Sequence, residues 1–270
     1  MTSRNSAKVR CPGKRDLCPF LTPLSVRIGS EPLLRDIERR GIKSLTSLRN
    51  KLGELPLRQL GTAIWVLGKV GNRNDVPNLL KIRQSQPTLV HEVLEALSNL
   101  GGKRAFNELV RSLQNRTLSL GVRIEACHGL GHRWSGKVPA SIFYPIVSSP
   151  DEDPNLRGYA AEGIGIRVPR RPKSEMRKAV EVLLPCLDDP SAEVRFWAVF
   201  ALAAMNARPA LPKLRRLARK DHADGPFGWS VAEEAKDAVY CLTHKGRWPE
   251  MDAGERRLRA MPTVAGKESS

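Results

Sequence analysis

The 270-residue sequence predicts an all-α protein, a right-handed α-solenoid of about six helical hairpins with a helical cap at its N-terminal end. Three observations lead to this prediction. A short pattern of small and apolar residues recurs along the chain, a second helical stretch lies between successive copies, and aromatic residues make up only 5% of the sequence. Such an aromatic content is low for a β-sandwich or a β-barrel.

The recurring pattern is six residues long and defines the first helix of each hairpin. Positions 1, 4 and 5 are small or apolar in every copy, and position 2 in all but the last, which traces one face of a helix and does not alternate as a strand would. We expect the small side chains to let neighbouring helices approach closely. The copies are residues 63–68, 93–98, 126–131, 160–165, 198–203 and 235–240, spaced 30 to 38 residues apart.

The second helix of each hairpin lies between the copies. Pro77 and Pro212 fall where the first turn of a helix tolerates a missing N–H group. Asp153 and Asp189 precede the other type of helix, where their side chains can cap exposed amide groups. The second helices are expected at residues 76–82, 105–110, 175–187 and 210–218.

The ends of the chain differ from the array. Residues 26–55 read as an N-terminal helical cap with short helices at 31–40 and 44–52, and residues 56–248 as the repeat array. Residues 1–25 are basic and rich in proline, and residues 249–270 are charged with few large apolar groups. Both ends are therefore expected to be flexible tails.

One segment carries a family resemblance. The sequence DPSAEVRFWAVFAL at residues 189–202, followed by RPALP at 208–212, resembles a HEAT repeat of the short bacterial kind shared with phycobilin-lyase-type proteins. Residues 153–157 and 122–123 share its Asp-Pro and Val-Arg core, and the likeness extends weakly over residues 56–242. The resemblance implies the solenoid fold. It leaves function open, since such repeats serve scaffolds, adaptors and a few enzymes.

Charge and composition narrow the function classes. The chain has 45 Lys and Arg against 28 Asp and Glu, a net charge of +17, and residues 1–55 and 56–150 each carry 12 basic and 5 acidic groups. This excess suggests an anionic partner. No apolar run approaches a membrane span, the N-terminus has no apolar signal segment, and five cysteines do not suggest a disulfide framework. We expect a cytoplasmic protein without a membrane partner.

The HEAT resemblance implies that the helix carrying Val-Arg lines the concave surface, with two positions per copy pointing into a groove. These positions are acidic in the middle of the array, aromatic on both sides, and contain no Lys or Arg. We interpret them as a groove for a basic, partly apolar segment of another protein. Alternatively, Trp197 and Phe200 fill space between helices. The candidate groove residues are Trp65, Glu92, Glu95, Glu125, His128, Tyr159, Glu162, Trp197 and Phe200.

A second hypothesis assigns binding to the basic outer surface, which could contact a nucleic-acid backbone without reading its sequence. The alkylpurine DNA glycosylases built from helical repeats keep basic residues and a catalytic carboxylate in the concave cleft, unlike this chain, so this hypothesis ranks below the first. The candidate residues are Arg167, Arg170, Arg171, Lys173, Lys213, Arg215, Arg216 and Arg219.

A third hypothesis is an enzyme of lyase or metal-hydroxylase type. Glu125 and His128 are spaced i, i+3 as in di-iron bundles, and His91-Glu92 resembles the His-Glu pairs of the HEAT-type hydroxylase that modifies deoxyhypusine. That family needs several such pairs, and the corresponding positions in the other copies do not supply them. We therefore expect no metal, cofactor or catalytic residue, and an adaptor rather than an enzyme.

Two further sets of residues have structural interpretations. Arg123, Arg157 and Arg195 occupy one position in three successive copies, where a ladder of guanidinium groups could bind phosphates. Pairing with aspartates at the repeat edge, namely Asp153 and Asp189, is the favoured interpretation. Cys127 and Cys186 fall on apolar positions and are expected in the core.

Overall fold

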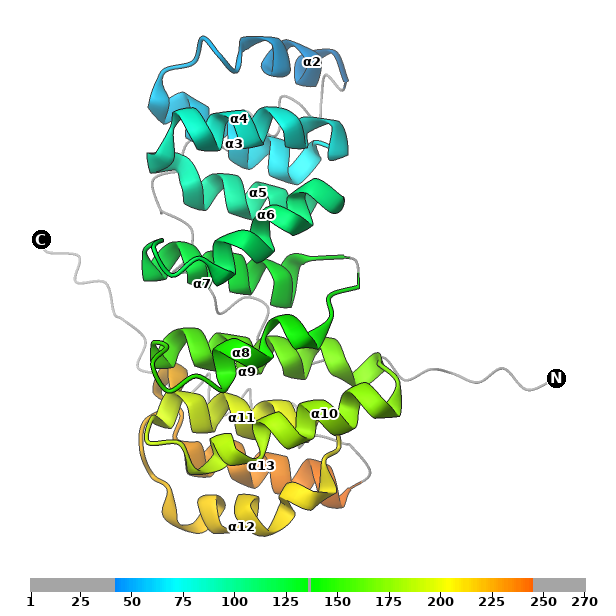
Figure 1. The fold of residues 1–270 in the computed structure, drawn as a ribbon, viewed down its shortest axis with the longest axis vertical. Coiled ribbons are helices and arrows are strands. Elements are labelled where there is room, and N and C mark those ends of the chain that lie inside the picture. Colours follow the sequence, from blue (N-terminus) through cyan, green and yellow to red (C-terminus); the bar gives the residue numbers. More distant parts are fainter. Residues whose placement is uncertain (1–41, 136, 245–270) are drawn as a thin grey trace, which may run out of the picture.

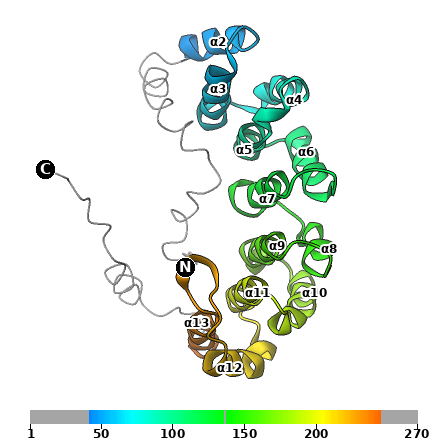
Figure 2. The same cartoon turned by 90° about the vertical axis from the view of Figure 1, so that its left-hand side faces the viewer.

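The computed structural model describes residues 42–244 except residue 136, and in this part of the chain helices form two layers that curve together (Figures 1 and 2). Figure 1 shows the helices stacked along the long axis, from α2 (Ile42–Lys51) at one end to α12 and α13 at the other. An isolated antiparallel bridge joins Asp224 and Ser230. Both predicted tails and the predicted cap helix at residues 31–40 lie outside the described residues.

The inner layer of the curve holds the helices that carry the recurring pattern (Figure 2). Each copy lies within one of these helices, and the copy in α7 continues into a π-helical turn, Gly129–Arg133. The fold class is confirmed as an α-solenoid. The inner helices are α3 (Leu57–Val70), α5 (Val90–Leu100), α7 (Leu120–His128), α9 (Pro154–Arg167), α11 (Ala192–Ala204) and α13 (Val231–Thr243).

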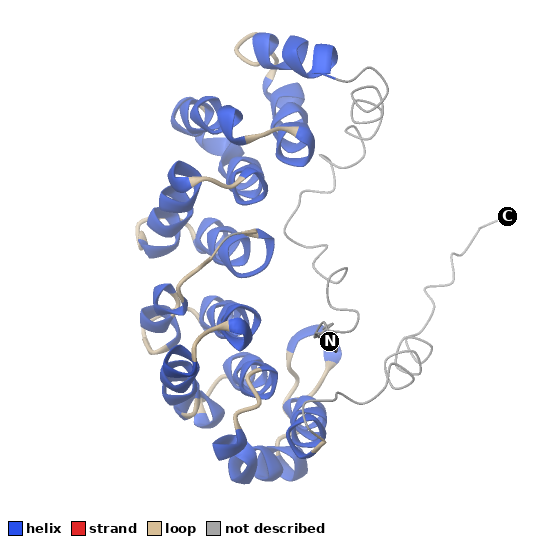
Figure 3. Ribbon diagram, turned by 90° about the vertical axis from the view of Figure 1, so that its right-hand side faces the viewer, coloured by secondary structure: helices blue, strands red, loops and turns tan. Residues whose placement is uncertain are grey.

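The outer layer follows the convex side of the arc (Figure 3). It consists of α4 (Val76–Ser85), α6 (Lys103–Gln114), α8 (Tyr144–Val147), α10 (Lys173–Leu183) and α12 (Leu211–Lys220). Short 3-10 turns connect the layers at Arg73–Asp75, Pro87–Leu89, Ala140–Ile142, Val168–Arg170, Pro185–Asp188, Arg208–Ala210 and Pro226–Gly228. No helix in the described part of the chain has the length and apolar character needed to cross a membrane.

The helix boundaries follow local chemistry. Pro77 and Pro212 lie in the first turns of α4 and α12, and Asp153 caps α9 by accepting a hydrogen bond from the Asn155 amide at 2.8 Å. The predicted helix at 175–187 is too long, because α10 ends at Leu183 and Pro185 opens a 3-10 turn. The short α8 was not predicted.

Small residues set the spacing of the inner helices. Position 6 of one copy packs on position 4 of the next: a Cβ placed on Gly68 would lie 2.8 Å from the Cα of Ala96, and one on Gly165 would lie 2.7 Å from the Cα of Ala201. The same relation brings Gly131 against Gly163 and Ser98 against Gly129. The expected close approach of neighbouring helices is confirmed.

Two glycines of α3 provide a matched test of this packing. Gly68→Ala would press a methyl group on the backbone of α5, so we expect the free energy of unfolding to fall by about 1–3 kcal/mol. Gly61→Ala places its methyl group 3.4 Å from the Leu89 side chain, an ordinary contact, and should raise stability by up to about 1 kcal/mol through helix propensity. Urea unfolding measures both. Equal effects of the two changes would contradict the packing rule.

Arginine–carboxylate pairs link successive repeats. Arg123 binds Glu152 through two hydrogen bonds of 2.7 and 2.9 Å, Arg195 binds Asp221 through two of 3.0 and 2.6 Å, and Arg157 binds Asp189. These contacts agree with the structural interpretation of the three arginines. One predicted partner was wrong: Arg123 binds Glu152, while Asp153 is used as the cap of α9.

Candidate partner-binding site

The residues predicted to line a groove all lie on helices of the inner layer (Figure 2). Trp65 on α3 and Tyr159 on α9 are half-buried, and the others are buried. The buried polar members are Glu92 and Glu95 on α5, Glu125 and His128 on α7, and Glu162 on α9.

Three carboxyl groups in the middle of the array form what we call the acidic cluster: Glu92, Glu95 and Glu125. Burial raises the pKa of Glu125 from 4.5 to about 7, the nearby Arg133 guanidinium opposes this, and the charges of Glu95 and Glu92 add to the increase. Glu92 and Glu95 lie on α5, which packs against α7, the helix that carries Glu125. The structure thus places three of the predicted positions on adjacent helices.

Basic side chains from the same inner elements reach the predicted acidic positions. The Lys69 ammonium lies 3.5 Å from Glu95 and 5.4 Å from the centre of the Trp65 ring, Arg133 binds Glu125, and His132 Nε2 lies 2.9 Å from Glu162. The predicted positions themselves contain no Lys or Arg, but basic residues further along the helices pair with them. Lys69 is four residues after Trp65 and therefore on the same helical face.

The acidic cluster keeps unused hydrogen-bonding capacity. Oε2 of Glu92, Oε2 of Glu125 and Nδ1 of His128 are buried and have no hydrogen-bond partner among the residues that the structure describes. Glu92 is 9% exposed and Glu125 only 1%. Buried polar atoms are normally paired, since an unpaired one loses its hydration without compensation. A hydrogen-bond donor bound beside the two carboxylate oxygens would compensate for this loss.

His128 is held in its neutral form. Burial, with additional repulsion from His132 and Arg133, lowers its pKa to about 2, and its ring stacks on that of His132 with centroids 4.3 Å apart. Of the i, i+3 pair, Glu125 thus pairs with Arg133, and His128 stacks on His132. Across the described residues, no three or more His, Cys, Asp or Glu side chains are placed to hold a metal ion.

Trp197 and Phe200 differ from the groove prediction. They are 3% and 4% exposed and belong to the hydrophobic core, as the alternative interpretation stated. The Trp197 indole donates a 2.7 Å hydrogen bond to Glu193 and packs where a Cβ on Gly158 would lie, 2.7 Å from its ring. Phe200 packs edge to face on Trp197. Both rings join α9 to α11.

The predicted basic surface is partly neutralised by carboxylates. Lys213 and Arg216 on α12 both bind Asp188, lowering its pKa, and Arg171 lies 3.9 Å from Glu175. Lys173, Arg215 and Arg219 are exposed, and Arg170 ends a 3-10 turn.

Arg167 departs from the predicted outer surface, because it is the last residue of α9, a helix of the inner layer. Its side chain is half-buried, burial followed by repulsion from Arg171 lowers its pKa to about 10, and its Nε and Nη2 atoms have no hydrogen-bond partner. Nε and Nη2 of Arg167 are therefore buried donors without an acceptor in the described part of the chain.

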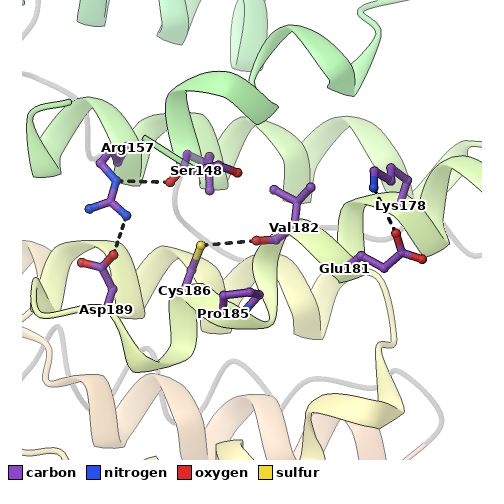
Figure 4. A pocket seen from close by; sticks show the side chains of 9 residues that line it. Ser148, Arg157, Lys178, Glu181, Val182, Pro185, Cys186 and Asp189 are labelled. Carbon is purple, nitrogen blue, oxygen red and sulfur yellow. Dashed lines mark hydrogen bonds and ion pairs between the residues drawn. The ribbon is translucent and has the colours of Figure 1, made fainter. Parts of the chain in front are cut away.

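A cavity of about 370 Å³ lies beside α10 (Figure 4). Its charged side chains and its thiol are already paired within the chain: Arg157 with Asp189, Lys178 with Glu181, and the Cys186 thiol with the Val182 carbonyl oxygen. Burial raises the pKa of Cys186 to about 11, so the thiol is neutral and unreactive. Among these groups, none is a buried carboxylate without a partner of the kind seen in the acidic cluster. Cys127 and Cys186 are both free and buried, as expected.

Comparison with known proteins addresses the fold. Residues 143–226 match the family model for HEAT repeats, and no curated protein matches the sequence. Similar solved structures include the complex of CpcE and CpcF of phycocyanin lyase from Nostoc, with 18% identity, a TM-score of 0.47, and coverage of 63% of this chain and 98% of the other. Computationally designed armadillo repeat proteins for modular peptide recognition show 17% identity, a TM-score of 0.45, and coverage of 73% and 99%.

Human deoxyhypusine hydroxylase is also similar, with 15% identity, a TM-score of 0.38, and coverage of 81% of this chain and 80% of the other. The family match covers two of the arginine-containing copies, at residues 160–165 and 198–203. It identifies residues 143–226 as HEAT repeats, the family that their Asp-Pro and Val-Arg pattern resembles.

Proposed function

We propose that the protein is a non-catalytic scaffold or adaptor that binds a basic segment of a partner protein on the concave face of its helical array. The observation that carries this proposal is the acidic cluster, in which Glu92 and Glu125 have buried carboxylate oxygens without a hydrogen-bond partner. Lysine and arginine side chains supply the missing donors and the opposite charge. We further propose a cytoplasmic location, in agreement with the free thiols of Cys127, Cys186 and Cys241.

Half-buried aromatic side chains on either side of the acidic cluster support the apolar part of this proposal. Trp65 on α3 and Tyr159 on α9 retain exposed surface on the inner layer. Aromatic rings of this kind bury large areas at protein interfaces with little loss of side-chain entropy. A segment that alternates basic and apolar residues would contact both kinds of group.

A defined peptide tests the proposal. The probe is a fluorescein-labelled peptide of sequence GLKLRLKLG, and its control replaces each basic residue by glutamate. We expect the basic peptide to bind and the double variant Glu92→Gln/Glu95→Gln to bind it at least about tenfold more weakly, because two carboxylates of the concave face lose their charge. Fluorescence anisotropy at fixed salt gives both dissociation constants.

The matched control is Glu181→Gln on the outer helix α10, whose side chain is 56% exposed. It removes one negative charge from the other side of the array and should leave the affinity unchanged. Absence of binding by the basic peptide, or equal losses in the inner and outer variants, would rule out the concave face as the binding surface.

Nucleic-acid binding is the second candidate function, and the unpaired Arg167 guanidinium favours it. A protein that binds duplex DNA through phosphate contacts loses affinity steeply as salt rises. The same anisotropy experiment with a labelled generic duplex, at low and moderate salt, decides between the candidates. Binding that falls steeply with salt and weakens in Arg167→Gln would support nucleic acid, and no binding at low salt would exclude it.

A further inference from the structure

Two unpaired carboxylate oxygens lie on adjacent helices of the inner layer. Glu92 on α5 and Glu125 on α7 are each at least nine-tenths buried, and Oε2 of each has no hydrogen-bond partner among the described residues. The two residues occupy the same position in successive repeats, each directly before a copy of the recurring pattern, and the charge of Glu92 contributes to the raised pKa of Glu125. The helices that carry them pack side by side (Figure 2).

Within residues 42–244, the charges around these oxygens leave one carboxylate without a cation. Lys69 of α3 pairs with Glu95, and Arg133 of the π-helical turn pairs with Oε1 of Glu125. His132 pairs with Glu162 of α9, and His128 of α7 is neutral. In the part of the chain that the structure describes, the acidic cluster thus has three carboxyl groups and two basic partners.

We propose that Glu92 and Glu125 together bind one guanidinium group, that of an arginine in the partner's basic segment; this inference rests on the proposed function. A guanidinium is planar and has several N–H donors in a fixed arrangement, so a single group can donate to oxygens on two helices. A lysine ammonium is a compact, strongly hydrated charge that satisfies such a pair less well.

The surroundings favour an organic cation over a metal ion. In the described part of the chain, no three or more His, Cys, Asp or Glu side chains are arranged as metal ligands. The Lys69 ammonium beside the Trp65 ring shows that this face already accommodates an organic cation next to an aromatic group. A bound arginine would extend the same arrangement toward α7.

Binding is coupled to a proton. With a pKa of about 7, Glu125 is partly protonated near neutrality, and a neighbouring guanidinium favours its charged form. The charged groups that act on it are Arg133 from the π-helical turn and Glu95 and Glu92 from α5. Arginine binding at pH 7 should release about half a proton per complex.

The test uses the basic peptide GLKLRLKLG and two versions in which the central arginine is replaced by citrulline or by lysine. Citrulline keeps the shape of arginine and removes its charge. We expect the citrulline peptide to bind wild-type protein at least about tenfold more weakly, with the lysine peptide in between. Against Glu92→Gln or Glu125→Gln, the arginine and citrulline peptides should differ by less than about threefold.

Glu162→Gln is the matched control on the same face, because it removes a carboxylate whose partner is His132. It should leave the preference for arginine over citrulline intact. Calorimetric titration at pH 7 in two buffers of different ionisation enthalpy measures the released proton, which should disappear in Glu125→Gln. Near-wild-type circular dichroism and urea midpoints confirm that each variant is folded.

The outcomes separate the two proposals. If the arginine peptide does not bind wild-type protein, both the proposed function and the arginine site are wrong. If it binds but the citrulline peptide binds equally well, or Glu162→Gln removes the preference as fully as Glu92→Gln, the concave face binds basic segments without this site. Binding without proton release likewise excludes Glu125 as a ligand of the guanidinium.

Discussion

Replacing Arg157 by methionine is expected to lower the free energy of unfolding by about 3–5 kcal/mol, because it leaves the carboxylate of Asp189 buried without a charge partner. The Arg157 side chain is 10% exposed and that of Asp189 is 7% exposed. Arg157 also donates a hydrogen bond to the Val147 carbonyl oxygen, so the same change removes a second link between α9 and the preceding repeat. Urea unfolding followed by circular dichroism measures the loss.

A pair on the same cavity provides the control (Figure 4). Lys178 and Glu181 lie 3.2 Å apart and are 63% and 56% exposed, so Lys178→Met should change stability by less than about 1 kcal/mol. The double variant Arg157→Met/Asp189→Asn should recover part of the loss, since it removes the uncompensated charge. If Arg157→Met costs no more than Lys178→Met, the buried pair does not hold the repeats together.

The inner helices could be predicted from the sequence because one set of residues controls both helix formation and packing. Gly68 and Ala96 are small because the backbones of α3 and α5 meet at these positions. The same contact is made between successive repeats, so small residues recur at these positions of the pattern. A larger side chain at either position would separate the helices. The repeat therefore appears in the sequence as a pattern of small residues as well as a helical period.

The position of Arg133 could not be predicted in the same way. A regular α-helix has 3.6 residues per turn, and a prediction from the sequence places residue 133 relative to Glu125 by that period. The π-helical turn at Gly129–Arg133 widens the helix and brings the guanidinium to Glu125. The two glycines of GLGHR at residues 129–133 are the visible signal, but they are equally consistent with close helix packing.

The burial of Trp197 depends on a residue one repeat earlier. Gly158 on α9 has no side chain, and the indole of Trp197 on α11 fills the space. Helical period places Trp197 on a face of its own helix, yet it does not say whether the neighbouring helix leaves room beside it. The glycine immediately before Tyr159 was the signal that could have assigned Trp197 to the core.

The acidic cluster should make stability fall as pH rises toward neutrality. Burial is the main cause that raises the pKa of Glu125 from 4.5 to about 7, so between these values the folded chain binds more protons than the unfolded chain. The free energy of unfolding then decreases with rising pH, by about 3 kcal/mol in total for this group. The loss is complete above about pH 7, where Glu125 is charged in both states.

Glu125→Gln isolates this contribution. His128 acts in the opposite direction over an overlapping range, because its pKa is lowered to about 2 in the folded chain, so the pH profile of the wild-type protein alone mixes the two groups. The difference in the free energy of unfolding between variant and wild type, taken at each pH from 4.5 to 8, removes the contribution of His128 where the two groups titrate independently. We expect the variant to gain stability relative to wild type as pH rises, with the midpoint of the change below pH 7. A difference that does not vary with pH would mean that Glu125 is ionised throughout this range. That result would rule out the proposed coupling of arginine binding to a proton.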